Sequence, residues 1–224
     1  NMPAAVDSVT VDASGNFSFS KPQSGFDFVG IGDSPNNAGL VIVSGGDNIS
    51  INGTKGNWIQ DYKTIGSPHS AALKEYFNKR QNYSNDIQKL KMDIQSYGNS
   101  NPTAVEAINQ QGMAMQVAFE EFKYNFIKTN INSPAVYAAF QDIYDLEKDE
   151  NILKDMAATM SKFMPNSIFA QAVEQKYQQA KQQNATPVTP APAGALTIGS
   201  VAPELNFPGL DGKNISLHGL KGQV

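Results

Sequence analysis

The sequence has no cysteine, only two histidines and one tryptophan among its 224 residues. Without cysteine, this stretch of chain can form neither a disulfide framework nor a cysteine–zinc site. No apolar run approaches the roughly 20 residues that an α-helix needs to cross a bilayer. The net charge is −4 and no basic block is present, which argues against binding to nucleic acid or to an anionic membrane, because neutralising phosphates takes clustered Lys and Arg.

Neither end of the sequence resembles the natural end of a domain. Residues Asn1 to Pro3 lack the charged and apolar pattern of a targeting segment and lead directly into a strand-like stretch. The last residues break off where a further domain is expected to begin. We therefore expect the sequence to be a fragment, truncated at both ends.

Residues 1–66 show the alternation of apolar and polar side chains that is typical of short β-strands. Turn sequences separate the strands, among them Gly45-Gly46-Asp47-Asn48. The run Ile49–Ile51 is expected to pair with Leu40–Val43 as a hairpin. Short strands at this spacing favour an antiparallel β-sandwich whose first strands lie upstream of Asn1. The predicted strands are Val6–Val11, Phe17–Phe19, Phe26–Ile31, Leu40–Val43 and Ile49–Ile51.

From Ser67 the apolar period lengthens from two to about three and a half residues, which indicates helices. Two long helices are expected to start at Ser67-Pro68 and Asn101-Pro102, and the first to stop at Gly98. Their apolar stripes predict an antiparallel helical hairpin. Three shorter helices are predicted from Ser133-Pro134, over Glu150–Phe163 and over Ser167–Gln183. The two stripes are Tyr76, Arg80, Tyr83, Ile87, Leu90, Ile94 and Tyr97, and Val105, Ile108, Met115, Phe119, Phe122 and Phe126.

The C-terminal part has a different composition. Residues 184–197 are rich in Pro, Ala and Thr and predict an extended, semi-stiff linker. Beyond the linker, Asp211-Gly212-Lys213 is a tight-turn sequence, and Ile215 and Leu217 then share one face of a strand. Residues 198–224 are therefore expected to form a hairpin that leads into another domain.

This closing segment resembles the opening of the redoxin and TlpA-like thioredoxin-fold domains. It carries G-x-x-A-P-E and then D-G-K-x-x-x-L-x-x-L-K-G, which run from Gly199 to Gly222. The upstream part resembles the β-sandwich domain of unknown function that precedes TlpA-like domains, with V-D-S-x-x-V-D-x-x-G-x-F-x-F, G-D-N-I-x-I-x-G and G-S-x-x-x-x-x-L-K-E-Y. The matching residues are Val6, Asp7, Ser8, Val11, Asp12, Gly15, Phe17, Phe19, Gly46, Asp47, Asn48, Ile49, Ile51, Gly53, Gly66, Ser67 and Leu73 to Tyr76.

Together, pattern and resemblance imply an α+β chain in four parts. These are an incomplete antiparallel β-sandwich over 1–66, a five-helix segment over 67–183, a linker over 184–197 and a truncated thioredoxin-like domain over 198–224. Family members are thiol–disulfide oxidoreductases, in which the next strand leads into a W-C-x-x-C helix start. This sequence stops at Val224, before that motif, so no catalytic residue can be assigned in it.

The resemblance also implies a setting and partners. Family members are exported to the periplasm of Gram-negative bacteria, often as lipid-anchored proteins, and act on disulfide-bearing client proteins. Residues 1–183 are then expected to serve as a docking or dimerisation module, which leaves a homodimer open. The alternative is a non-enzymatic accessory or scaffold subunit of a cell-envelope complex. A third reading is a carbohydrate- or lipid-binding sandwich that uses Trp58.

Few residues are candidates for chemistry, and we predict no catalytic, cofactor-binding or metal-binding residue. His69 and His218 lack a second ligand at a suitable spacing and are expected at the surface. Ser133, Ser161 and Ser167 have no neighbouring histidine in the sequence, which leaves a serine hydrolase unsupported.

Two further features have a plain structural explanation. The acidic cluster Asp142, Asp145, Glu147, Asp149 and Glu150 lacks the spacing of a calcium loop and is expected to be a solvated helix end. Trp58 is expected to pack against a core.

Overall fold

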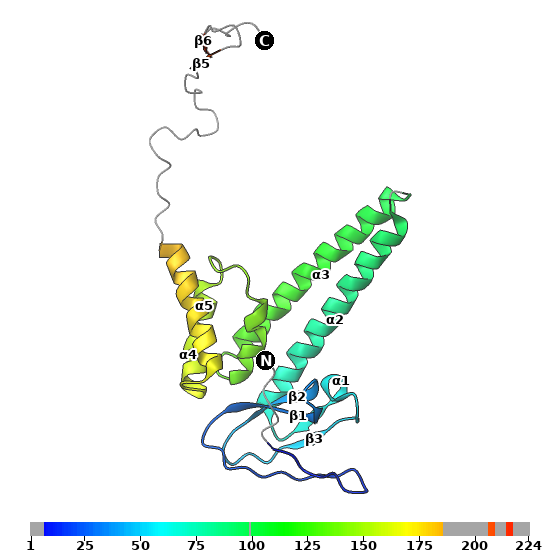
Figure 1. Ribbon diagram of the computed structural model, residues 1–224, viewed down its shortest axis with the longest axis vertical. Coiled ribbons are helices and arrows are strands. Elements are labelled where there is room, and N and C mark those ends of the chain that lie inside the picture. Colours follow the sequence, from blue (N-terminus) through cyan, green and yellow to red (C-terminus); the bar gives the residue numbers. More distant parts are fainter. Residues whose placement is uncertain (1–6, 99, 186–205, 209–213, 217–224) are drawn as a thin grey trace. The chain divides into compact units, whose positions relative to one another are not determined.

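The computed structural model describes residues 7–98 and 100–185 and two short strands, 206–208 and 214–216 (Figure 1). The chain divides into two units, Asn1–Gln183 and Asn184–Val224. The described part is a mixed α+β structure, about 58% helical, with small antiparallel sheets. None of the described helices has the length and apolar character needed to span a bilayer.

The strands of the first unit pair in two separate hairpins. Strand β1 (Asp27–Ser34) runs antiparallel to β2 (Asn37–Val43), with Val29 opposite Val41. This confirms the two central strands predicted from the sequence. Strand β3 (Ser50–Asn52) pairs with β4 (Lys63–Ile65), so the expected pairing of Ile49–Ile51 with Leu40–Val43 is wrong. The three residues of β4 are too few to show an alternation in the sequence.

Residues 7–66, all of them described, do not form a closed sandwich. The described residues of the two predicted strands Val6–Val11 and Phe17–Phe19, which are 7–11 and 17–19, do not form strands. Val9, Val11 and Phe19 are 45%, 53% and 48% exposed, because no second sheet covers them. The turn between them does form, with the Gly15 amide donating to the Asp12 carbonyl at 3.0 Å. Alternation alone does not make a strand, because a strand also needs a partner to pair with.

A buried tyrosine joins the two hairpins. Tyr62 follows the short helix α1 (Trp58–Asp61), is 3% exposed and donates its hydroxyl to the Leu40 carbonyl at 2.8 Å. Its ring lies so close to Gly39 that a Cβ there would overlap it. Burial raises the pKa of Tyr62 to about 12.

The raised pKa of Tyr62 predicts a loss of stability at alkaline pH. In the unfolded chain the phenol ionises near pH 10, so the folded state holds its proton more tightly above that pH. The stabilisation is complete below about pH 10 and is lost between about pH 10 and 12. We expect the urea midpoint to fall less between pH 9 and 11 in Tyr62→Phe than in the wild type. Equal falls of the urea midpoint in the two proteins would contradict the raised pKa of Tyr62.

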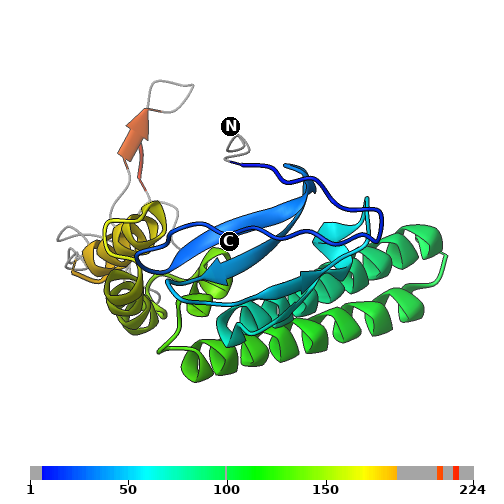
Figure 2. The ribbon, with the colours of Figure 1, turned by 90° about the horizontal axis from the view of Figure 1, so that it is seen from below.

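Two long helices form the predicted hairpin. Helices α2 (Pro68–Tyr97) and α3 (Pro102–Thr129) lie side by side in both views (Figures 1 and 2). The Ser67 hydroxyl accepts the Ser70 amide at 3.1 Å, and the Asn101 side chain accepts the Ala104 amide at 3.1 Å. Both caps and both prolines lie where the sequence predicted them, which confirms the starts of both helices and the end of the first at Gly98.

The core of the first unit draws on β2 and on every helix after α1. The short helix η1 (Pro134–Asp142) is followed by α4 (Glu150–Phe163) and α5 (Ile168–Ala185). The α-helix predicted from Ser133-Pro134 is in fact a 3₁₀ helix. Six of its nine residues are buried, and at three residues per turn they lie on several sides of the helix: Pro134, Ala135, Val136, Ala138, Ala139 and Asp142. Burial on several sides therefore outweighed the intrinsic preference for an α-helix.

The hairpin packs densely only at its base. Leu73 and Tyr76 of α2 and Phe119 and Phe126 of α3 are buried there. Between residues 84 and 118, which we call the arm, Leu90 is the sole buried residue among those described. A pair of helices can bury only one stripe each, so the outer faces of the arm remain exposed.

Buried serines fasten the start of α2 to β2. Ser70 is fully buried, and its hydroxyl accepts the Ile42 amide at 2.9 Å and lies 3.0 Å from the Ile42 carbonyl. Ser67 contacts the same carbonyl at 3.1 Å. Strand and helix are therefore joined through one residue, Ile42.

Removing the Ser70 hydroxyl should be costly for its size. In Ser70→Ala the Ile42 amide, which lies in the core, loses its partner, at a cost of about 2 kcal/mol in unfolding free energy. Ser96→Ala, which removes an exposed hydroxyl from the same helix, is the matched control and should change stability by less than about 0.5 kcal/mol. Urea unfolding measures both. Equal losses of stability in the two variants would mean that the Ser70 hydroxyl does not hold α2 to β2.

In the second unit, β5 (Asn206–Pro208) and β6 (Asn214–Ser216) pair antiparallel, with Phe207 opposite Ile215. This confirms the hairpin predicted around Asp211-Gly212-Lys213. The described residues of this unit do not show a thioredoxin-like domain. The predicted linker lies outside the described residues, apart from Asn184 and Ala185 at the end of α5.

Candidate functional site

A buried polar cluster lies at the base of the hairpin, centred on Asp142 at the end of η1. Asp142 is 6% exposed. Its carboxylate accepts the Tyr76 hydroxyl at 2.9 Å and pairs with the Arg80 guanidinium at 3.1 Å. Burial and the neighbouring Asp142 carboxylate both raise the pKa of Tyr76. Tyr76 therefore remains a hydrogen-bond donor, and the cluster ties α2 to η1.

A buried lysine extends the cluster to α3. Lys123 is 2% exposed, and its ammonium donates to the Asp142 carbonyl at 3.0 Å and to the Glu120 carboxylate at 2.7 Å. From α5, Lys176 donates to the Phe140 carbonyl at 3.2 Å, and burial lowers the pKa of this lysine. Charged side chains from three helices thus converge on the end of η1.

The next segment, residues 144–149, carries a second buried acid. Asp149 is 1% exposed and accepts the Tyr124 hydroxyl at 2.9 Å, while its other carboxylate oxygen has no hydrogen-bond partner. Burial, followed by the hydrogen bond to Asp149, raises the pKa of Tyr124. The ammonium groups of Lys123 and Lys148 lie 4.6 and 4.9 Å from the centre of the Tyr124 ring. Tyr124 therefore links the buried cluster to the surface.

The acidic cluster is not the solvated helix end that the sequence suggested, because Asp142 and Asp149 are buried. Their partners Tyr76 and Tyr124 come from helices that are distant in the sequence, and spacing within 142–150 cannot reveal such contacts. No group of three or more metal-binding side chains is found in the described part of the chain.

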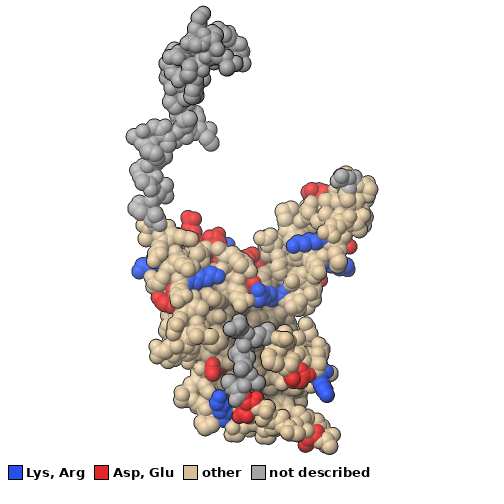
Figure 3. Space-filling model, viewed as in Figure 1, with Lys and Arg blue, Asp and Glu red and all other residues tan. Residues whose placement is uncertain are grey.

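Above the cluster, a groove of about 550 Å³ opens between α3 and Lys148. Its wall on α3 includes Met113 and Val117, which are 58% and 59% exposed, and Glu120, Glu121 and Tyr124. The space-filling view shows a hollow between the arm and α4–α5, with charges of both signs around it (Figure 3). Apolar and charged groups in one open groove suit another polypeptide better than a small molecule, which binds in an enclosed pocket.

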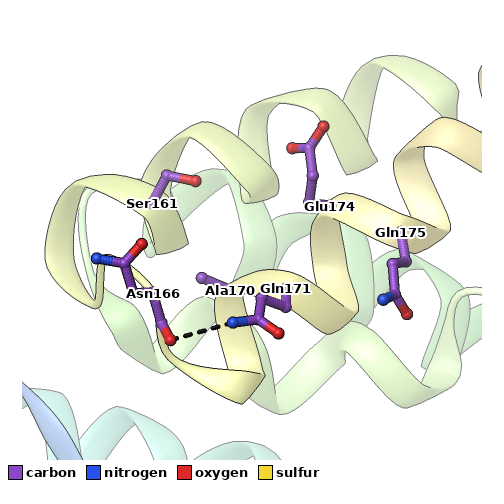
Figure 4. A pocket seen from close by; sticks show the side chains of 6 residues that line it. All are labelled: Ser161, Asn166, Ala170, Gln171, Glu174 and Gln175. Carbon is purple, nitrogen blue, oxygen red and sulfur yellow. Dashed lines mark hydrogen bonds between the residues drawn. The ribbon is translucent and has the colours of Figure 1, made fainter.

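A second hollow, of about 290 Å³, lies between α4 and α5. Its side chains are drawn in Figure 4, where Gln171 donates to the Asn166 carbonyl at 3.2 Å. Ser161, one of the candidate serines, lies at its edge and is exposed. The polar groups are spread along the two helices and do not converge on one point, so this hollow offers no reaction centre.

His69 is not the isolated surface residue that the sequence suggested. It is half-buried, its Nδ1 atom lies 2.7 Å from the Ser133 hydroxyl, and its ring packs edge-on against Phe26. Ser133 therefore does have a histidine neighbour, from a residue 64 positions earlier in the sequence. The same hydroxyl accepts the Ala135 amide at 3.1 Å as the cap of η1. The pair thus fastens η1 to α2.

Other candidates are structural or lie outside the described residues. Trp58 is half-buried and packs against Gly53. Its ring centre lies 6.2 Å from that of Phe17, and neither residue belongs to the main core. Gly46 adopts a left-handed turn, with φ of 86°, that does not join paired strands. Ser167 caps the start of α5 by accepting the Ala170 amide at 3.0 Å. His218 lies outside the described residues.

No protein-family model, curated protein or solved structure matches this chain.

Proposed function

We propose that residues 1–183 are the docking or dimerisation module of an exported thiol–disulfide oxidoreductase with a role in redox homeostasis. Its catalytic cysteines would lie beyond Val224. Strands upstream of Asn1 would complete a β-sandwich, and strands downstream would complete a thioredoxin-like domain. The redox part of the proposal is supported by the resemblance of Gly199–Gly222 to TlpA-like domains, within which β5 and β6 pair as expected.

The docking part is carried by one observation, the exposed apolar pair Met113 and Val117 in the groove on α3. An exposed apolar patch with charged residues at its rim, here Glu120, Glu121 and Lys148, is typical of a site that binds another protein. The buried cluster holds α3 rigidly to η1, so a partner bound along the groove would be fixed relative to the whole unit. Such a module would place a redox domain near its client proteins.

The setting follows from the resemblance. Family members act in the periplasm of Gram-negative bacteria, often through a lipid anchor, on clients that carry disulfides. A thiolate at a helix N-terminus would perform the exchange, because the helix dipole lowers the thiol pKa. No cofactor is needed for that reaction.

The gene beyond Val224 gives the first test. A W-C-x-x-C sequence shortly after this chain supports the oxidoreductase, and a degenerate motif supports the non-enzymatic scaffold subunit instead. Where the cysteines are present, the intact protein should reduce disulfides, and a Cys→Ser variant should not. Deleting residues 1–183 should then slow reaction with protein clients but not with a small disulfide. Equal loss on both substrates would contradict a docking role.

A further inference from the structure

Helix α3 carries a second stripe with coiled-coil spacing, on the face turned away from α2. Its positions follow one another at intervals of four, three, four, three and four residues, as a and d positions do. Polar residues occupy both ends and the two apolar residues lie at the centre. The stripe consists of Glu106, Gln110, Met113, Val117, Glu120 and Tyr124.

The stripe is open to solvent over most of its length. Glu106 and Gln110 are exposed, Met113 and Val117 are 58% and 59% exposed, and Glu120 is partly exposed. The inner stripe of the same helix is covered by α2, so that a Cβ added at Gly112 would lie 3.7 Å from the Leu90 side chain. Helix α3 therefore has two stripes, and within the first unit only the inner stripe is covered by another helix.

The open stripe complements itself in one direction only. When two copies run antiparallel with Met113 opposite Val117, Gln110 lies opposite Glu120 and Glu106 lies opposite Tyr124. Lys148 lies 4.9 Å from the Tyr124 ring, so the Glu106 carboxylate would approach the Lys148 ammonium of the second copy. A parallel alignment in register would instead set Glu106 against Glu106 and Glu120 against Glu120, which repel.

We propose that the occupant of the groove is a second copy of this chain, bound through α3 in a two-fold symmetric, antiparallel dimer. The inference rests on the proposed docking function and names its partner. The apolar pair would form the centre of the interface, and a Glu106–Lys148 pair would close it at each end. A symmetric contact of this kind uses the same surface on both copies and does not extend into filaments.

Single cysteines test the register, because residues 1–224 contain no cysteine. Glu106→Cys and Lys148→Cys chains are purified, mixed in equal amounts and oxidised. The mixed 106–148 dimer should dominate, and Glu106→Cys alone should cross-link poorly, since in the antiparallel dimer its two copies lie about 27 Å apart. Efficient cross-linking of Glu106→Cys with itself would overturn the antiparallel register.

Sedimentation equilibrium tests the interface itself. The wild-type chain should be dimeric at micromolar concentration, and Val117→Glu should raise the dimer dissociation constant by about tenfold or more. Met92→Glu is the matched control on the outer face of α2, where the wild-type residue is 55% exposed, and should change nothing. Glu106→Lys should weaken the dimer, and adding Lys148→Glu should restore it.

A wild-type chain that stays monomeric, or a Val117→Glu chain that stays dimeric, overturns the dimer. Neither result touches the docking of client proteins, which fails separately if residues 1–183 make no difference to client reduction. Circular dichroism of each variant shows that it is folded.

Discussion

Phe126→Ala should lower the free energy of unfolding by about 4 kcal/mol, the largest effect expected of a single substitution in this chain. Phe126 is 5% exposed, and its ring centre lies 4.7 Å from that of Tyr76. Removing it deletes an aromatic contact between α2 and α3 and leaves a cavity at the only part of the hairpin that packs densely. Its ring neighbours, Tyr76 on α2 and Phe122 on α3, are each fixed by their own helix and cannot fully close the cavity.

The measurement is urea unfolding followed by circular dichroism, at a low protein concentration so that association does not contribute. Met92→Ala, a truncation of an exposed side chain on α2, serves as the control and should cost less than about 0.5 kcal/mol. A small effect of Phe126→Ala would mean that the base of the hairpin is loosely packed. It would also remove the rigidity on which the docking proposal relies.

Local signals in the sequence predicted the helices well. Ser67-Pro68, Asn101-Pro102 and Gly98 act on their own turn of chain, so caps and stops could be located without knowing the fold. The hairpin of α2 and α3 follows from their apolar stripes for the same reason. Helix η1 is the exception, because its 3₁₀ form depends on burial by segments distant in the sequence.

The strands were harder to predict, since a strand depends on its neighbour. Alternation marked Val9 and Phe19 as strand residues, but they are exposed and unpaired within the described region. The partner of β3 proved to be β4, which has no pattern of its own. Pairing is a long-range property that a single sequence does not display.

The candidate site was missed for a similar reason. The acids of the 142–150 segment read as solvated because their spacing matches no known loop, yet Asp142 and Asp149 are held by Tyr76 and Tyr124. Lys123 lies within an apolar stretch of α3. A lysine on the inner face of a helix was the one signal in the sequence that could have indicated a buried polar cluster. The outer stripe of α3 was visible in the sequence, but without exposure data it could not be separated from the stripe that packs on α2.

The buried cluster itself should be sensitive to loss of its central acid. Asp142→Ala removes the acceptor of the Tyr76 hydroxyl and the partner of Arg80, while Lys123 remains buried nearby. Breaking a buried ion pair costs about 3–5 kcal/mol, and we expect about 3 kcal/mol because Arg80 is 37% exposed and regains water. Asp145→Ala, which removes an exposed carboxylate from the neighbouring segment, should cost less than about 1 kcal/mol.

A double-mutant cycle distinguishes the cluster from simple packing. Tyr76→Phe alone should cost about 2 kcal/mol, because it leaves a buried carboxylate oxygen without its donor. In the Asp142→Ala background the same change should cost close to nothing, since the acceptor is already gone. Additive costs in urea unfolding would mean that the two groups do not depend on one another. The contact between α2 and η1 would then depend on Arg80 and on the hydrogen bond between His69 and Ser133 instead.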